Sequence, residues 1–216
     1  MNHLQPTVIV LAAGLGSRFD GQRHKLEQAL DDDAHHASSV LAVTIGHAIA
    51  SRLPVLVVTT AALEPLARSQ VAARDVIVVP AAAPIRGRGI GDSIAAGVAA
   101  RSDAAGWLIL PADMPRVQPA TLQAVARALA QHAVSYAQHA GRRGHPVGFA
   151  AELYSELVML SGDEGARRLV ARYPAHGVDV DDPGALIDID TVADLTALRN
   201  MQGGKAATQA PPPGRR

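Results

Sequence analysis

The sequence lacks cysteine, has only 3% aromatic residues and carries no net charge, since 20 Lys and Arg balance 20 Asp and Glu. Without cysteine there is no disulfide framework, no thiolate zinc site and no cysteine nucleophile, which fits a reducing compartment. A neutral chain also lacks the positive field of a dedicated nucleic-acid binder. No run is long and apolar enough to cross a membrane. We therefore expect a cytoplasmic protein with no nucleic-acid or membrane partner.

Short apolar runs alternate with helical segments along the 216 residues. Four runs are continuously apolar, as buried strands are, and lie at residues 8–11, 54–60, 75–79 and 107–110. Further strands are expected at residues 133–138, 145–149 and 186–189. Helices are expected at residues 38–51, 63–73, 92–100, 119–132, 150–160, 165–172 and 191–199. This alternation predicts a three-layer α/β fold in which helices cover both faces of a mostly parallel sheet. We expect one domain over residues 1–202 and a disordered tail over 203–216, where the hydrophobic periodicity is lost.

A glycine-rich loop follows the first expected strand, at the strand end where such folds bind ligands: Leu11-Ala12-Ala13-Gly14-Leu15-Gly16-Ser17-Arg18. Its small residues let backbone amides approach an anion, and Arg18 and Lys25 are cations suited to a polyphosphate. The loop is no P-loop, because the Gly-Lys-Ser/Thr ending is missing. It is also a poor dinucleotide fingerprint, because Phe19 replaces the third glycine. A glycine-rich turn with two solvated basic residues is the competing interpretation.

Further motifs follow the loop in order: Gly91-Asp92-Ser93-Ile94, Asp113-Met114-Pro115, Arg143-Gly144-His145-Pro146 with residues 162–167, and Asp188-Ile189-Asp190-Thr191. Over residues 8–199 the set resembles the MobA-like nucleotidyltransferases, and most of all the molybdenum cofactor cytidylyltransferases. The resemblance implies a Rossmann-like nucleotidyltransferase fold and magnesium-dependent transfer of CMP from CTP to molybdenum-bearing molybdopterin. A phosphate oxygen of the acceptor attacks the α-phosphorus and pyrophosphate leaves, which requires positioning and charge neutralisation more than covalent help.

The resemblance also implies roles for individual residues. Arg18 holds the triphosphate, Lys25 stabilises charge at the transferred phosphoryl group, and Asp113 holds Mg²⁺. Asp190 is the second metal ligand, with Asp188 as its rival. The nucleotide-binding residues are Leu11, Ala12, Ala13, Gly14, Gly16, Ser17, Gly91 and Ser93, and the acceptor-binding residues are His145, Asp163 and Arg167.

Most of these residues could instead have a purely structural role. Each of the three aspartates named as metal ligands could cap the helix that follows it. His145 could be a structural histidine at the start of a strand, and Asp163 an ordinary acidic residue in the first turn of a helix. The gap between Arg18 and Lys25 is longer than is usual in the family, so His24 or Arg23 could take the place of Lys25.

One methyl group bears on which nucleotide base the pocket accepts. Ala13 stands where the guanylyl-transferring relatives carry glycine, so its side chain narrows the pocket and favours a pyrimidine over a purine. The width of a pocket alone discriminates only modestly between two nucleotides. CTP is therefore the preferred donor, and GTP stays open as an alternative. A sugar or small-acid phosphate acceptor also stays open, as does a molybdenum cofactor carrier without turnover. The product would pass to a molybdoenzyme or its insertion chaperone.

Overall fold

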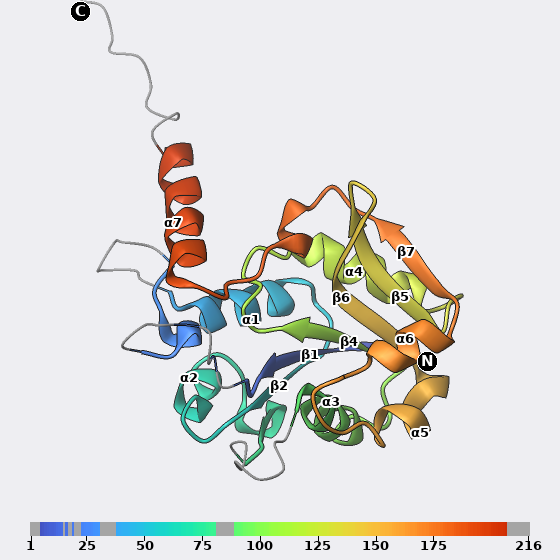
Figure 1. Cartoon of the computed structure of the whole chain (residues 1–216). Helices are drawn as coiled ribbons and strands as arrows, with labels where there is room; N and C mark the ends of the chain where they lie inside the picture. Colours follow the sequence, from blue (N-terminus) through green and yellow to red (C-terminus); the bar gives the residue numbers. More distant parts are fainter. Residues whose placement is uncertain are drawn as a thin grey trace, which may run out of the picture.

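The computed structural model describes residues 5–14, 16, 19, 23–30, 38–80 and 89–206, the last of these without side chains beyond residue 201. The described residues form a seven-stranded sheet in the order β3-β2-β1-β4-β6-β5-β7 (Figure 1). The strands are β1 Thr7–Ala12, β2 Val55–Thr59, β3 Val76–Val78, β4 Gly106–Pro111, β5 Val134–His139, β6 Arg142–Ala150 and β7 Ala175–Asp179. Every pairing is parallel except those of β6, which runs antiparallel to β4 and β5. The predicted mostly parallel sheet is confirmed.

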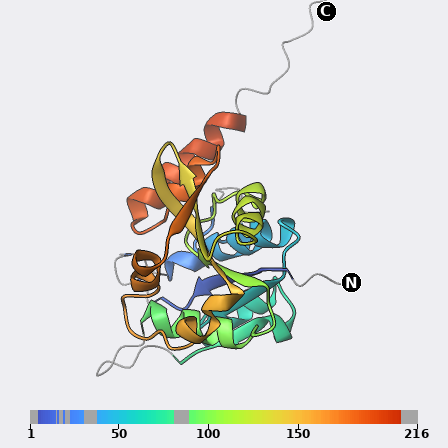
Figure 2. The ribbon, with the colours of Figure 1, turned by 90° about the vertical axis from the view of Figure 1, so that its right-hand side faces the viewer.

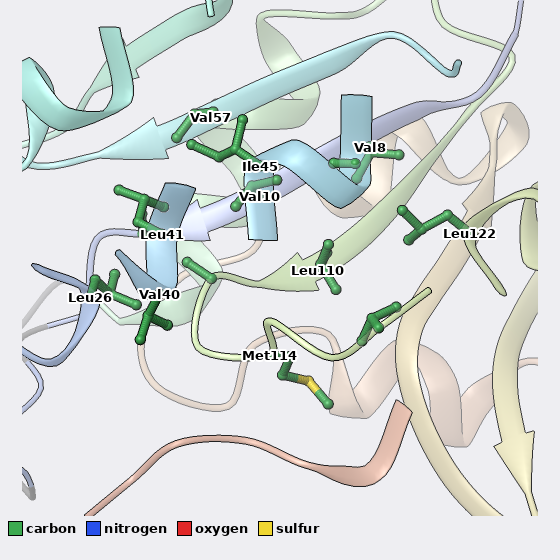
Figure 3. Packing of buried hydrophobic residues seen from close by; sticks show 14 of the residues in the cluster. Val8, Val10, Leu26, Val40, Leu41, Ile45, Val57, Leu110, Met114 and Leu122 are labelled. Atoms are coloured by element: carbon green, nitrogen blue, oxygen red, sulfur yellow. The ribbon is translucent and has the colours of Figure 1, made fainter. Parts of the chain in front are cut away.

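Helices cover both faces of this sheet (Figures 1 and 2). They are α1 Val40–Ala50, α2 Glu64–Arg68, α3 Ile90–Ala99, α4 Pro119–Ala128, α5 Tyr154–Leu157, α6 Arg167–Arg172 and α7 Val192–Ala206. Alternate residues of β1 point to opposite faces, so Val8 and Val10 join one core while Ile9 and Leu11 join the other. The first core includes side chains of α1, α4 and α7, and Figure 3 shows Val10 beside Ile45 of α1. The second core includes side chains of α3, α5 and α6, which makes three layers.

The strand order reverses at β1. The chain builds β1, β2 and β3 toward one edge and then returns to place β4 on the other side of β1. Leu11 lies opposite Pro111 in the parallel register, so the loops that follow the two strands leave the sheet side by side. This is the switch point at which open α/β sheets bind ligands, and it coincides with the glycine-rich loop and the Asp113 motif.

The C-terminal third differs from the expected pattern. The strand expected at 186–189 is wrong, because the N–H groups of Ile187 and Ile189 donate to Gly184 and Asp113 and not to a neighbouring strand. Leu186 itself ends a 3-10 helix over Pro183–Leu186. The edge strand β7 was not predicted from the sequence, because its glycine and its exposed polar residues interrupt any apolar run. Helix α7 extends to Ala206, over the first residues of the expected tail, and residues 207–216 lie outside the described part. Among the described helices, none has the length and apolar character to span a membrane.

Candidate active site

A pocket of about 320 Å³ opens at the carboxyl ends of β1 and β4. We call it the first pocket. Five residues predicted to bind the nucleotide line it, together with Lys25, Asp113 and Asp190. The five are Leu11, Ala13, Gly14, Gly16 and Ser93. Segments distant in the sequence thus bring a lysine and two carboxylates to the edge of the glycine-rich loop.

Lys25 lies between the two carboxylates. Its Nζ donates to Oδ2 of Asp113 at 2.6 Å, to Oδ1 of Asp190 at 3.1 Å and to the carbonyl oxygen of Ile189 at 2.9 Å. Burial by itself lowers the pKa of Lys25, but the charges and hydrogen bonds of the two aspartates outweigh it and the pKa rises above its ordinary value. Lys25 is therefore a cation at neutral pH, although only 12% of its side chain is exposed.

Backbone contacts fix the position of Asp113. The N–H of Ala112 donates to the carbonyl oxygen of Leu11, and the hydroxyl of Thr44 in α1 donates to the carbonyl oxygen of Ala112. On the other side, the N–H of Ile189 donates to the carbonyl oxygen of Asp113 at 3.0 Å. Asp113 is therefore held between β1, α1 and the segment that carries Asp190.

Neither aspartate of the pocket caps the helix that follows it. At the start of α4, the buried carboxylate of Asp182 accepts from the N–H of Gln118 and the hydroxyl of Thr121. At the start of α7, Thr191 and Asp194 bind each other's backbone and side chain in a capping box. A capping role therefore does not describe Asp113 or Asp190. The rival residue Asp188 is exposed and lines neither described pocket.

The donor set fits a divalent cation of the magnesium type. Oδ1 of Asp113 is buried and has no hydrogen-bond partner among the described residues, so it is an acceptor without a donor. Within the same part of the chain, no cluster of three or more His, Asp or Glu side chains forms a complete protein cage. Mg²⁺ does not need one, since it commonly binds one or two carboxylates together with substrate phosphates and water.

His24 ties the two ends of the glycine-rich loop together. The N–H of Leu26 donates to its Nδ1 at 3.2 Å, so Nε2 carries the proton and donates to the carbonyl oxygen of Gly14 at 3.1 Å. The ring also lies under Gly16, where a Cβ atom would be 3.3 Å from Nε2. His24 thus braces the loop, and Lys25 is the cation between the carboxylates. Arg23, the second residue considered in place of Lys25, is exposed.

A second pocket of about 650 Å³ adjoins the first, and Ile90 and Pro111 line both. We call it the second pocket. His145 of β6 lines it, as do Asp163 and Arg167, so the residues predicted to bind the acceptor lie together. Its walls combine these polar groups with the apolar side chains of Ile94, Ile109, Val147, Phe149 and Val170. Such a pocket suits a ligand that is partly apolar and partly anionic.

A model of the MobA-like NTP transferase domain matches residues 8–178 of the chain. The chain belongs to this family. No curated protein matches it significantly. The family assignment confirms the resemblance drawn from the motifs and shows that the chain is a nucleotidyltransferase-type domain.

Several solved structures share the fold of this chain. The Rv0371c protein of Mycobacterium tuberculosis H37Rv is 26% identical with a TM-score of 0.76, over 93% of this chain and all of that one. It has also been solved in complex with manganese, at 25% identity and a TM-score of 0.68, covering 91% of this chain and 98% of that one. A nucleotidyl transferase from Methanothermobacter shares the fold at 23% identity and a TM-score of 0.73, covering 93% of this chain and 99% of that one.

Most of the site residues predicted from the family motifs line one of the two pockets. Ala12 is fully buried in β1 and Gly91 donates its N–H to Gly162, so neither lines the first pocket. Ser17 and Arg18 lie outside the described residues. Sequence reasoning missed Leu26, Ile90 and Pro111 in the first pocket and Arg143 in the second. Arg143 belongs to the Arg-Gly-His-Pro motif, and its guanidinium stacks 4.7 Å from the ring centre of Tyr136.

The free energy of unfolding of the chain should depend on pH through His145. Its Nδ1 is buried without a hydrogen-bond partner among the described residues. Burial lowers the pKa of His145 and Arg143 lowers it further, against Asp113 and Asp188, which raise it. The unfolded chain therefore takes up a proton near pH 6.5, while the folded chain does so only at lower pH.

We expect the free energy of unfolding to be greatest above pH 7 and to fall as the pH drops through this range. Urea unfolding at pH 7.5 and pH 5.5 measures the fall, and His145→Gln should show a smaller one than the native chain. Equal falls in the two proteins would mean that other groups cause the effect.

Proposed function

We propose that this chain transfers CMP from CTP to molybdenum-bearing molybdopterin, with Mg²⁺ as the cofactor and pyrophosphate as the second product. The observation that carries the proposal is the pair of pockets with a common wall at Ile90 and Pro111. The first holds a lysine and two aspartates at a glycine-rich loop. The second holds two arginines, two carboxylates and an apolar wall, so a nucleotide and a phosphate-bearing acceptor would meet between the pockets.

In this proposal each charged group of the first pocket has a separate task. Asp113 and Asp190 hold the metal, and the manganese complex of the Mycobacterium relative supports a divalent ion in this fold. When bound, the ion neutralises the charge of the triphosphate and of the leaving pyrophosphate. Lys25 moves from the carboxylates to the transferred phosphoryl group and stabilises the charge that develops there. Arg18 and Ser17 complete the triphosphate site, as the family resemblance implies.

The acceptor would lie in the second pocket with its phosphate toward the first. Arg143 and Arg167 supply positive charge, and the ring of His145 forms part of the same wall. The apolar wall can pack against the flat face of a pterin ring system, and the polar side chains of the same pocket can bind the polar edge of that ring. The product would pass in the cytoplasm to a molybdoenzyme or its insertion chaperone.

Pyrophosphate release tests the proposal. The protein is assayed with Mg²⁺ and each of CTP, GTP, ATP and UTP, with and without molybdenum cofactor. Release with CTP only when the cofactor is present would support donor, acceptor and reaction together. Release with GTP would make the chain a guanylyltransferase. Binding of CTP without release under any condition would favour a molybdenum cofactor carrier.

The Ala13 methyl group should set the donor preference. It lines the first pocket beside Gly14, and its removal widens the pocket. We expect Ala13→Gly to lower the ratio of kcat/KM for CTP over GTP by about tenfold, the usual effect of one methyl group in a pocket. Ala12→Gly is the matched control, since Ala12 is buried outside the pocket. An unchanged ratio in Ala13→Gly would contradict the pocket-width argument.

A further inference from the structure

The start of helix α3 is joined to the turn at residues 161–165. Oδ2 of Asp92 accepts from the N–H of Gly89 at 2.9 Å and from the N–H of Gly162 at 2.9 Å. The N–H of Gly91 donates in return to the carbonyl oxygen of Gly162 at 2.9 Å. One carboxylate oxygen therefore bridges two backbone segments that lie about seventy residues apart in the sequence.

The two segments are in such close contact that no side chain fits between them. A Cβ atom on Gly89 would lie 1.9 Å from the carbonyl carbon of Gly162, and one on Gly91 would lie 2.9 Å from Ser161. On the other side, a Cβ atom on Gly165 would lie 2.7 Å from Cγ2 of Ile90. The glycines thus allow the approach, and the charge-assisted hydrogen bonds of Asp92 hold it.

This contact lies between the two pockets. On the α3 side, Ile90 and Ser93 line the first pocket. On the other side, Asp163, Glu164 and Gly165 belong to the wall of the second pocket. The position of that wall relative to the nucleotide site therefore depends on the link between α3 and the 161–165 turn.

We propose that Asp92 is a positioning residue for the acceptor: it fixes the 161–165 turn to the nucleotide-binding helix and so sets the geometry between the two pockets. This inference rests on the proposed function, because it takes the second pocket as the acceptor site. Asp92 lines neither pocket itself and acts through the turn. Its loss leaves Gly162 without its carboxylate partner, whereas Ser93 is still held by the backbone of α3.

Steady-state kinetics with Asp92→Ala and Asp92→Asn test the proposal. Pyrophosphate release is measured with CTP, Mg²⁺ and molybdenum cofactor. Asp92→Ala should raise KM for the cofactor by about tenfold, a typical loss for hydrogen bonds to a charged group, while KM for CTP stays within about twofold. Asp92→Asn keeps an oxygen that can accept both N–H groups, so it should restore most of the affinity for the cofactor. Unchanged KM values in Asp92→Ala, or equal rises for CTP and cofactor, would overturn the proposal.

Hydrogen exchange separates this inference from the proposed function. In Asp92→Ala, but not in Asp92→Asn, the backbone amides of residues 161–167 should exchange faster than in the native chain, while those of β1 and β4 are unaffected. If the native chain releases no pyrophosphate, the proposed function fails. The exchange experiment then shows by itself whether Asp92 holds the 161–165 turn to α3. Unchanged exchange at 161–167 in Asp92→Ala would then overturn the positioning role.

Discussion

Asp113→Asn is expected to lower metal-dependent pyrophosphate release by roughly a thousandfold while leaving the fold intact. The asparagine has the shape of the native side chain, so the backbone contacts with Leu11, Thr44 and Ile189 survive. It removes the negative charge from a buried oxygen that has no partner among the described residues, and from one that lies 2.6 Å from Lys25. A neutral amide is a poor ligand for a hard cation, so the ion and the triphosphate lose their anchor.

The measurement is the rate of pyrophosphate release over a titration of Mg²⁺, with circular dichroism as a check of the fold. Asp188→Asn is the matched control. It changes the net charge by the same amount as Asp113→Asn, but Asp188 is exposed and lines neither pocket. The control should keep nearly native activity. Full activity in Asp113→Asn would remove this residue from the metal site.

The sequence was most informative where a local pattern determines the structure. Continuously apolar runs such as residues 8–11 form buried strands, because a strand covered on both faces needs apolar side chains in both directions. The motif residues that follow β1 and β4 then meet because these adjacent parallel strands end at one edge of the sheet. Lys25 and Asp113 are brought together in this way, and Asp190 joins them from a segment that is not a strand.

Features that depend on tertiary contacts could not be predicted from the sequence. The brace formed by His24 needs the carbonyl of Gly14 and the N–H of Leu26 at the same ring, which no spacing rule specifies. The link at Asp92 likewise depends on Gly162, whose approach follows only from packing. Strand β7 is stabilised by pairing with β5 and not by its own residues, so its sequence resembles that of a loop.

Lys25→Met should have two opposite effects, on turnover and on metal binding. The methionine keeps the length and apolar stem of lysine but removes the cation that neutralises the transferred phosphoryl group, so pyrophosphate release should fall by roughly a thousandfold. In the native chain, the ammonium group of Lys25 occupies the space between the oxygens of Asp113 and Asp190, at 2.6 and 3.1 Å. A divalent ion that binds the same oxygens competes with this ammonium group unless a triphosphate draws the lysine away.

Without the lysine, the two carboxylates lose the cation that lies between them, so Lys25→Met should be less stable than the native chain at pH 7. Mn²⁺ alone should then raise the melting temperature of Lys25→Met more than that of the native chain, because a ligand that binds the folded chain more tightly stabilises it more. Arg23→Met is the matched control, since it removes a neighbouring exposed charge and should respond to Mn²⁺ like the native chain. If Mn²⁺ shifted all three proteins equally, the ammonium group and the metal would not share these oxygens. The carboxylate pair would then be an ion-pair site for Lys25, and the metal would have to bind elsewhere in the first pocket.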